Sequence, residues 1–483
     1  MKNLNRELNN SVKNLPIKVV QFGEGNFLRA FVDYAFQVLN EEVGFNAGVA
    51  VVQPIEKGMV SLLNEQDGLY TLFTKGIKYG AEVKEKILVQ NIVKGINPYE
   101  AFNAFMSLAR EKELEFVISN TTEAGISFDE NDTQEMQPPN SFPGKLTLFL
   151  HERFQYFKGS KDSGGLTIIP CELINYNADT LKTIILKYIS LWGLSGDFKH
   201  WVLNACTFHN TLVDRIVPGY PKDDIEEYDG QLNYKDRLIV SAEAFFLWVI
   251  EGDAHLKEKL PFHKTDLDVQ IVPDMQPYRT RKVRILNGAH TAMVPLGLLH
   301  GNETVKDTVD DSFTGTFIRS LIFEEVIPTL EMDKRELEDF AKDVFDRFRN
   351  PFIKHQLSSI ALNSVSKFKV RVLPSLLEYV QLNKRLPLKM VFAFACLIRF
   401  YQGQWKGVDL PLNDDVAIID NFKKLWGLPN LSNTVHQVLG NTDYWDTDLN
   451  NVDGLSEAIE LALNHLEANG VEEGFTKFVD SYK

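Results

Sequence analysis

The chain contains little cysteine, and its cysteines are not spaced to form a disulfide framework or to bind a metal. The three of them, Cys171, Cys206 and Cys396, lie far apart among 483 residues. An odd number of dispersed cysteines does not suit a disulfide scaffold, and no CxxC, HExxH or dense His/Cys cluster has the spacing of zinc ligands. The sequence therefore predicts neither disulfides nor a metal site.

Long apolar runs and an excess of positive charge are also absent. The longest apolar stretches, near Ala244–Ile250 and Met390–Ile398, are far shorter than the ~20 residues that span a bilayer. Residues 1–11 lack the apolar core of a signal peptide, so we expect a cytoplasmic protein. A net charge of −15 argues against nucleic acids and anionic membranes as partners, because both attract clustered Lys and Arg. An anionic substrate would need a local basic pocket.

A glycine turn near the N-terminus indicates a dinucleotide-binding fold. Residues 17–22 have the character of a short buried strand, Gly23-Glu-Gly25 follows directly, and a helical apolar pattern includes Phe31. Such a turn lets backbone N–H groups approach a pyrophosphate at the positive end of a helix. Leu28 stands where the general fingerprint has a third glycine, and Gly-x-Gly turns also occur for steric reasons alone.

Strand and helix signals continue through the first half of the chain. Segments with strand character follow at 47–53, 68–76, 115–119, 166–170 and 268–272. A helical pattern begins at Pro98 and precedes the strand at 115–119, which makes an αβ step. A mainly parallel sheet is the expected result, with its ligand beyond the carboxyl ends of the strands.

The second half is predicted to be predominantly α-helical. Helical periodicity occurs at 178–193, 241–251, 277–299, 315–330, 334–349, 373–383, 388–401, 416–425 and 455–467. We place the domain boundary near residue 276, ahead of the helix that carries Lys282. The predicted fold class is therefore α/β, with a Rossmann-type dinucleotide-binding domain at 1–276 followed by a mainly α-helical domain at 277–483.

That helix carries three polar side chains that could act together as an acid/base group. They are Lys282, Asn287 and His290. At about 100° per residue they lie roughly at 0°, 140° and 80° around the axis, so one broad face could hold all three. An amine with a lowered pKa can exchange a proton with an alcohol near neutral pH, and an amide can hydrogen-bond the oxygen. The alternative is a surface lysine, a capping asparagine and a core histidine.

Three motifs follow one another along the chain. Gly-x-Gly-x-Phe-x-Arg-Ala begins at Gly23, Asn-x-x-Val-Asp-Arg-Ile-x-Pro at Asn210, and Lys-x4-Asn-x2-His at Lys282. Together they resemble the mannitol dehydrogenase family of polyol-specific long-chain dehydrogenases, over nearly the whole chain. The resemblance implies a metal-independent, NAD-dependent oxidoreductase in which Lys282 is the general acid/base, with Asn287 and His290 beside it.

Local variants of these motifs resemble the tagaturonate-reducing branch of the family. They lie at 21–30, 119–125, 170–174 and 362–368. This branch implies reversible hydride transfer between NADH and the keto group of tagaturonate, in hexuronate catabolism. Fructuronate reductase and a mannitol or other polyol dehydrogenase are the alternatives within the family. A dinucleotide-binding sensor without catalytic activity is an alternative of another class.

The candidate cofactor contacts lie in the loops after the expected strands. They are Phe22, Gly23, Gly25, Asn26, Phe27, Arg29, Gln53, Thr121, Thr122 and Glu123. Gln53 is the candidate for the adenosine ribose, because its strand closes without the acid that many dinucleotide folds place there. No arginine cluster lies nearby to bind a 2′-phosphate, and the resemblance also implies NAD. Alternatively, Gln53 could simply begin a loop, and Ser119–Gly125 could be a turn with a helix cap.

Three residues are candidates for binding the substrate. The resemblance implies that Asp214 lies in the substrate site, although it could also form a structural ion pair with Arg215, which we expect to be structural. One of the family's two oxyanion-binding asparagines is absent, because Leu173 stands at its place, and Asn177 is a candidate replacement, with Asn175 as the alternative. The third candidate, Lys367, matches an active-site lysine of the family.

Lys367 belongs to a short basic run in an otherwise acidic chain. The run also contains Lys369 and Arg371, whereas Ser359 stands where the family has an arginine. On a helix these side chains diverge by about 200° at each step of two residues, so we expect Lys367 alone to reach the substrate and the other two to be solvated. A carboxylate is its natural partner, which favours a uronate. A solvated surface run is the alternative. The sequence leaves the oligomeric state open.

Overall fold

The structure is a computed structural model of the chain and describes residues 2–8, 14–122, 124–159 and 164–482. Two compact units are present, one formed by Met1–Lys75 with Val83–Met275 and the other by Gly76–Glu82 with Gln276–Lys483. The sequence placed all of residues 1–276 in the first domain, whereas Gly76–Glu82 groups with the second unit, in which the Gly80 N–H donates to Asp346. None of the helices in the described ranges has both the length and the apolarity that a membrane crossing needs.

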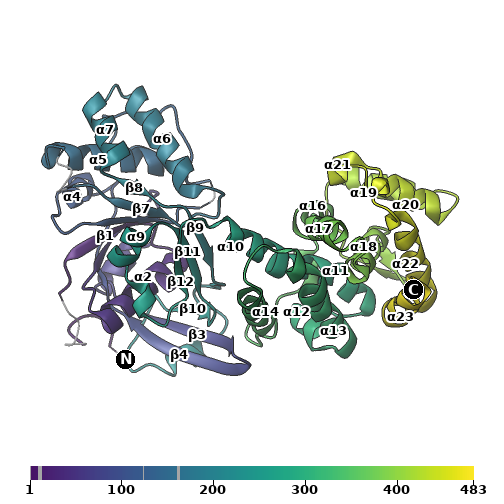
Figure 1. Cartoon of the computed structure of the whole chain (residues 1–483). Coiled ribbons are helices and arrows are strands. Elements are labelled where there is room, and N and C mark those ends of the chain that lie inside the picture. Colours follow the sequence, from purple (N-terminus) through teal and green to yellow (C-terminus); the bar gives the residue numbers. More distant parts are fainter. Residues whose placement is uncertain (1, 9–13, 123, 160–163, 483) are drawn as a thin grey trace. The chain divides into compact units, whose positions relative to one another are not determined.

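A six-stranded parallel sheet forms the core of the first unit (Figure 1). In spatial order its strands are β5 (Ile92–Ile96), β2 (Gly48–Val52), β1 (Ile17–Phe22), β6 (Phe116–Ser119), β7 (Thr167–Pro170) and β8 (Thr207–Phe208). Every pairing is parallel, and the chain proceeds outward from β1 in both directions. This is the strand order of doubly wound dinucleotide-binding folds, whose ligands bind where the order reverses. The predicted α/β class is confirmed.

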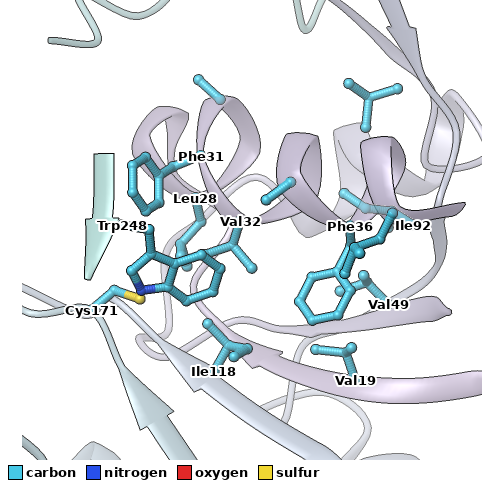
Figure 2. Packing of buried hydrophobic residues seen from close by; sticks show 14 of the residues in the cluster. Val19, Leu28, Phe31, Val32, Phe36, Val49, Ile92, Ile118, Cys171 and Trp248 are labelled. Atoms are coloured by element: carbon cyan, nitrogen blue, oxygen red, sulfur yellow. The ribbon is translucent and has the colours of Figure 1, made fainter. Parts of the chain in front are cut away.

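Side chains of the central strands point alternately into two apolar cores, one on each face of the sheet. On β1, Val19 belongs to one core and Phe22 to the other. Figure 2 shows the first core, in which Phe31 and Phe36 pack over the sheet near Trp248. Because both faces are covered, the strands are rich in apolar residues, and the first strand was recognisable from the sequence for this reason, although it also contains Lys18 and Gln21.

Two three-stranded sheets accompany the parallel sheet. One joins β10 (Val240–Glu243), β3 (Tyr70–Lys78) and β4 (Ala81–Val89), and the other joins β12 (Val269–Val272), β11 (Leu247–Glu251) and β9 (Thr211–Asp214). The helix predicted at 241–251 is therefore wrong, because this segment forms β10 and β11. Trp248 is fully buried against the rings of Phe31 and Phe262. Periodicity alone does not distinguish a short, fully buried strand from a helix.

Helices of the first unit cover both faces of the parallel sheet. In chain order they are α1 (Asn26–Ala30), α2 (Val32–Val38), η1 (Leu39–Val43), α3 (Val60–Glu65), α4 (Phe102–Leu108), α5 (Phe142–Tyr156), α6 (Asn177–Leu191), α7 (Gly196–Asn204), α8 (Ile225–Asp229), α9 (Ala254–Lys259) and η2 (Phe262–Lys264). Phe36 of α2 packs in one core, whereas Phe149 of α5 and Ile185 of α6 pack in the other.

The second unit is mainly helical, as predicted. Its elements are α10 (Gln276–Arg281), η3 (Lys282–Asn287), α11 (Gly288–His300), α12 (Val305–Asp310), α13 (Ser312–Ser320), η4 (Leu321–Val326), η5 (Ile327–Thr329), α14 (Lys334–Phe348), α15 (Leu357–Ile360), α16 (Ser364–Arg371), α17 (Leu373–Asn383), α18 (Leu388–Phe400), β13 (Gln404–Trp405), β14 (Val408–Asp409), α19 (Val416–Trp426), α20 (Leu431–Leu439), α21 (Thr442–Trp445), η6 (Leu449–Asn451), α22 (Leu455–Asn469) and α23 (Val471–Tyr482). The segment predicted as one α-helix at 277–299 contains the π-helix η3.

The three cysteines are free thiols and are buried. Cys171 and Cys206 belong to the first unit and Cys396 to the second. Burial raises the pKa of all three thiols, that of Cys206 to about 12.

A carboxyl group is buried close to the glycine turn. Asp33 of α2 is inaccessible to solvent, and Gln21 Nε2 lies 3.3 Å from its Oδ2 and 3.0 Å from Gly23 O. Burial raises the pKa of Asp33 to about 7, against the opposing effects of the Gln21 hydrogen bond and the Arg29 charge. The folded chain therefore keeps a proton on Asp33 at pH values where the unfolded chain has released it.

We predict that Asp33→Asn stabilises the protein at pH 8. The folded-state pKa lies above the ordinary value of 3.8, so stability falls as the pH rises from that value to about 7. The neutral amide removes this loss, and the expected Tm is higher by roughly 5 °C or more at pH 8, with a smaller gain at pH 5. Thermal denaturation measures the effect, with exposed Glu42→Gln as the control for losing one charge. Equal gains at both pH values would contradict the prediction.

Candidate functional site

The glycine turn after β1 contains two glycines with different reasons for being there. Gly23 has φ +123°, and a Cβ there would lie 2.8 Å from Leu28 Cδ1 and 3.0 Å from Asn120 O. The fold itself therefore requires a glycine at this position. Gly25 has φ −66°, and a Cβ there would meet no atom within 4 Å. No contact among the described residues requires a glycine at position 25, whereas the close approach of a dinucleotide pyrophosphate would.

Arg29 braces the glycine turn from inside the protein. Its Nε donates to Glu24 O at 3.2 Å, within the turn, and its Nη1 donates to Leu238 O at 2.6 Å. Its Nη2 donates to Asn26 Oδ1 at 2.6 Å. Arg29 is only 2% exposed. Two of the predicted cofactor residues, Arg29 and Asn26, are thus hydrogen-bonded to each other, and Arg29 holds the shape of the turn.

Two further predicted cofactor residues contribute mainly by packing. The side chain of Phe22 is fully buried, with its ring 5.9 Å from the Phe105 ring, so only its backbone reaches the loops. Its carbonyl accepts from Asn120 N–H at 3.2 Å. Phe27 is partly buried and stacks on Phe31 with the ring centroids 4.9 Å apart.

Glu172 fastens the loop after β6, a role that the sequence did not indicate. Its carboxylate accepts hydrogen bonds from Ser119 Oγ, Thr121 N and Thr121 Oγ1, each at 3.0 Å. Burial raises the pKa of Glu172, and these donors oppose the rise. Thr122 follows with φ +123°, which a threonine seldom adopts. The predicted contact Glu123 lies outside the described residues.

The Gln53 side chain holds the loop that follows β2. Its Nε2 donates to Ile55 O and Glu56 O, each at 2.9 Å, and its Oε1 accepts from Val60 N at 3.3 Å. The Gln53 amide therefore hydrogen-bonds backbone groups of its own loop. This agrees with the alternative that Gln53 begins a loop, which the sequence had left open. A ribose contact at this position would require one of these bonds to be exchanged.

A cavity of about 530 Å³ is present where β2 and β5 end. This volume falls in the range of small-molecule sites. Gln53 lines the cavity together with Lys57, Lys94, Glu56 and Glu100. The two lysines are offset by two glutamates, so the charge of the lining does not favour an added 2′-phosphate.

Asp214 and Arg215 lie at the end of β9 and differ in role. Asp214 is 7% exposed, so a small part of it remains accessible. Arg215 is buried, donates from Nε to Glu243 O at 3.0 Å and from Nη1 to Ala30 O, and lies 4.9 Å from the Tyr34 ring centroid. Burial lowers the pKa of Arg215 to about 10. Arg215 is structural, as expected.

Asn177 ties the end of β7 to β9. Its Nδ2 lies within hydrogen-bond distance of Pro170 O at 3.0 Å and Glu172 O at 3.1 Å. Its Oδ1 accepts from Ala178 N at 2.9 Å and Thr211 N at 3.0 Å. The side chain is fully buried. The geometry gives Asn177 a structural task, and contact with a substrate oxygen would have to displace one of these bonds.

The π-helix η3 aligns two of the three predicted acid/base residues. Lys282 and Asn287 are its first and last residues, and i→i+5 bonding brings side chains at that spacing close to one face. An α-helix would separate them by about 140°. His290 follows three residues later in α11 and is a surface neighbour of Asn287. All three side chains are half-buried, whereas Leu286 and Ala289 are buried. The spacing therefore directs the three positions toward one side of the helix, and each residue keeps some exposure.

Aromatic side chains surround the His290 ring. Its centroid lies 4.5 Å from that of Phe348 and 5.2 Å from that of His355. Burial lowers the pKa of His355. A neutral His355 at pH 7 does not repel positive charge on this face, and the two rings fix the orientation of the His290 imidazole.

Helix α16 packs against η3 and α11 and carries the basic run. Lys367 Nζ donates to Ile360 O at 2.9 Å, and burial, followed by the charge of Arg371, lowers the pKa of Lys367. The expectation that the other two cations are solvated is wrong. Lys369 pairs with Asp446 at 2.6 Å, and Arg371 packs on α11 because Gly288 lets the helices approach closely.

The predicted site residues fall into two sets. The candidate cofactor residues belong to the first unit with Asp214 and Asn177, and the acid/base residues belong to the second with Lys367. Within the described part of the chain, no group of three or more His, Cys, Asp or Glu side chains is placed to hold a metal ion.

Comparison with known families gives a match to each unit. Residues 17–264 match a model described as the mannitol dehydrogenase Rossmann domain, and residues 274–467 match one described as the mannitol dehydrogenase C-terminal domain. The chain is 45% identical to altronate oxidoreductase of Bacillus subtilis (strain 168), covering 99% of this chain and 98% of that protein. It is 44% identical to altronate oxidoreductase of Yersinia pestis, covering 94% and 95%.

Solved structures support the same fold. A D-sorbitol dehydrogenase in substrate-free form has a TM-score of 0.82 at 20% identity, covering 98% of this chain and 100% of that one. A Pseudomonas fluorescens mannitol 2-dehydrogenase in ternary complex with NAD and D-mannitol has a TM-score of 0.65 at 21% identity, covering 99% and 100%.

We predict that substitutions at the two glycines separate folding from cofactor binding. Gly25→Ala should leave Tm nearly unchanged, because its φ suits any residue and its Cβ meets open space. It should weaken NADH binding by about 10-fold or more, because the Cβ obstructs the pyrophosphate. Gly23→Ala, the matched control, should lower Tm itself. Fluorescence titration with NADH and thermal denaturation measure both effects, and unchanged NADH affinity in Gly25→Ala would exclude this turn as the pyrophosphate site.

Proposed function

The chain belongs to the mannitol dehydrogenase family, and we propose that it is an NAD-dependent altronate oxidoreductase, which transfers a hydride reversibly between NADH and the keto group of tagaturonate. The observation that carries this proposal is the 42% to 45% identity with altronate oxidoreductases over nearly the full length of each chain. The alignments cover 99% and 100% of this chain, so they extend over both the loops of the parallel sheet and the helix with Lys282.

The first unit has the features that NAD requires. Gly25 leaves open space at the start of α1, where the oxygens of a pyrophosphate would accept hydrogen bonds from backbone N–H groups. The cavity at the ends of β2 and β5 is large enough for the adenosine half. Thr121 and Thr122 follow β6, the neighbour of β1, and are proposed to border the cofactor. When bound there, the nicotinamide supplies the hydride-transfer chemistry.

Lys282 is the proposed general acid/base. In the reducing direction its ammonium donates a proton to the substrate oxygen on which negative charge develops, and in the oxidising direction the amine takes the proton back. The Asn287 amide shares this face of the helix and donates a hydrogen bond to the same oxygen, which stabilises the developing charge. His290 orients the neighbouring hydroxyl or the lysine itself.

The substrate contacts outside this helix are proposed at Lys367 and Asp214. Lys367 Nζ uses one of its three donors on Ile360 O, which leaves two for a carboxylate oxygen. Asp214 retains some exposure at the end of β9 and is suited to accept from a sugar hydroxyl. The cation on α16 favours a sugar acid over a neutral sugar.

The main alternatives are fructuronate reductase and a mannitol or other polyol dehydrogenase of the same family. The exposed Leu173 stands where the family has an oxyanion-binding asparagine, and this disfavours a mannitol-type site. A sensor without activity is disfavoured because Lys282, Asn287 and His290 share one face.

Lys282→Ala is expected to reduce turnover by at least about 100-fold, because general acid/base groups contribute on the order of 10²–10⁴-fold. NADH affinity should be unchanged, since the glycine turn lies in the other unit. Steady-state rates and NADH titration measure these quantities, with exposed Lys334→Ala as the matched control. Turnover close to that of the wild type would remove Lys282 from the mechanism.

NADH consumption with tagaturonate, fructuronate and fructose, measured side by side, tests the substrate. We expect kcat/KM for tagaturonate to exceed that for fructose by about 10-fold or more, because a charge-assisted contact to a carboxylate is worth about 1.5–3 kcal/mol and fructose has none. Efficient reduction of fructose would support a polyol dehydrogenase, and a preference for fructuronate would support a fructuronate reductase.

A further inference from the structure

Two cations on α16 lack a carboxylate partner. Lys367 and Arg371 are four residues apart, and no ion pair within 4 Å joins either of them to an acid in the described residues. Their neighbours differ in this respect. Lys369 pairs with Asp446 at 2.6 Å, and Arg284 of η3 pairs with Glu378 at 3.3 Å. The two side chains thus form a pair of positive charges on one helix of a chain whose net charge is −15.

Arg371 is also held in a position that hydration alone does not explain. Its Nη1 lies 3.5 Å from Thr291 Oγ1, which donates to Asn287 O at 2.9 Å. Its carbonyl oxygen lies 3.2 Å from the position of a Cβ at Gly288. Burial lowers the pKa of Arg371, and no acid offsets this effect. The guanidinium is therefore half-buried against the part of α11 that adjoins Asn287.

Placing Lys367 and Arg371 close together and partly buried is unfavourable unless an anion binds between them. Like charges four residues apart on a helix repel each other, and a cation withdrawn from water loses hydration that only a partner restores. A guanidinium and a carboxylate match in geometry, because two parallel N–H donors meet two oxygens. Lys367 adds a second charge, and the Thr291 hydroxyl fixes one side of the guanidinium.

We propose that Arg371, together with Lys367, binds the carboxylate of the sugar-acid substrate and is a specificity-determining residue for uronates over neutral ketoses. This inference rests on the proposed function and deepens it. Thr291 positions the guanidinium one helical turn from Asn287, so one rigid segment aligns the charged end of the substrate with the group that holds the reacting oxygen.

Arg371→Met and its matched control, Lys369→Met, test the inference. The control removes a cation from the same helix that already has Asp446 as its partner. Arg371→Met should raise KM for tagaturonate by about 10- to 100-fold with little change in kcat, because binding to the carboxylate is equal in the ground and transition states. The control should leave KM within about 2-fold, and Lys367→Met should act in the same direction as Arg371→Met.

Arg371→Lys keeps the charge but loses the two parallel donors, and should give an intermediate KM. Protection against thermal unfolding by altronate, with NADH absent, provides a readout besides activity and should be weaker in Arg371→Met than in the control. Tm without ligand establishes that each variant is folded, and Arg371→Lys carries the test if Arg371→Met is not.

The outcomes separate the two claims. Wild type that reduces tagaturonate, with KM unchanged in both Arg371 variants, overturns the inference and leaves the proposed function intact. Wild type that reduces fructose but not tagaturonate overturns the proposed function and the inference with it. A rise in KM for tagaturonate that is absent for fructose supports both.

Discussion

The loops at the carboxyl edge of the six-stranded sheet depend on buried polar side chains that satisfy backbone groups away from water. These anchors are Arg29 after β1, Gln53 after β2, Glu172 for the loop after β6, and Asn177 after β7. A buried backbone group without a partner is strongly unfavourable, so each loop is limited to the shape that its anchor allows. The same polar residue types that signal a binding site therefore also build it, and a ligand at this edge would meet loops that are already in place.

The sequence predicted four strands of the parallel sheet, β1, β2, β6 and β7, because they have a simple physical signature, but it missed β5 and β8. The strands predicted at 68–76 and 268–272 exist but belong to the two three-stranded sheets. β1 is a mainly apolar segment closed by a glycine turn, and its predicted bounds coincide with those observed. The run at 241–251 has equal apolarity but no such boundary, and it was assigned to a helix although it forms two strands. Local apolarity indicates that a segment is buried but does not distinguish a strand from a helix. The segment around Trp248 forms a strand because it pairs with β9 and β12, which are distant in sequence.

Residue types in the candidate site were predictable, but their partners were not. Lys282, Asn287 and His290 were identified by spacing, yet the π-helical geometry that aligns the first two follows from packing and not from the residues themselves. Arg29 was expected near a cofactor, but its hydrogen bond to Leu238 O joins residues 209 positions apart. Glu172 was not predicted to take part in the site, since nothing local shows that it faces Ser119 and Thr121.

The reactivity of the three buried thiols reports local opening of the protein, and no label has to be introduced. The thiolate is the group that attacks an electrophilic thiol reagent, so Cys171, Cys206 and Cys396 can be labelled at neutral pH only when the surrounding structure opens. The first two report on one unit and the third on the other. Labelling followed by mass spectrometry would therefore give a separate opening free energy for each unit in the unmodified protein. It would also show which unit NADH makes more rigid and which unit a sugar acid makes more rigid.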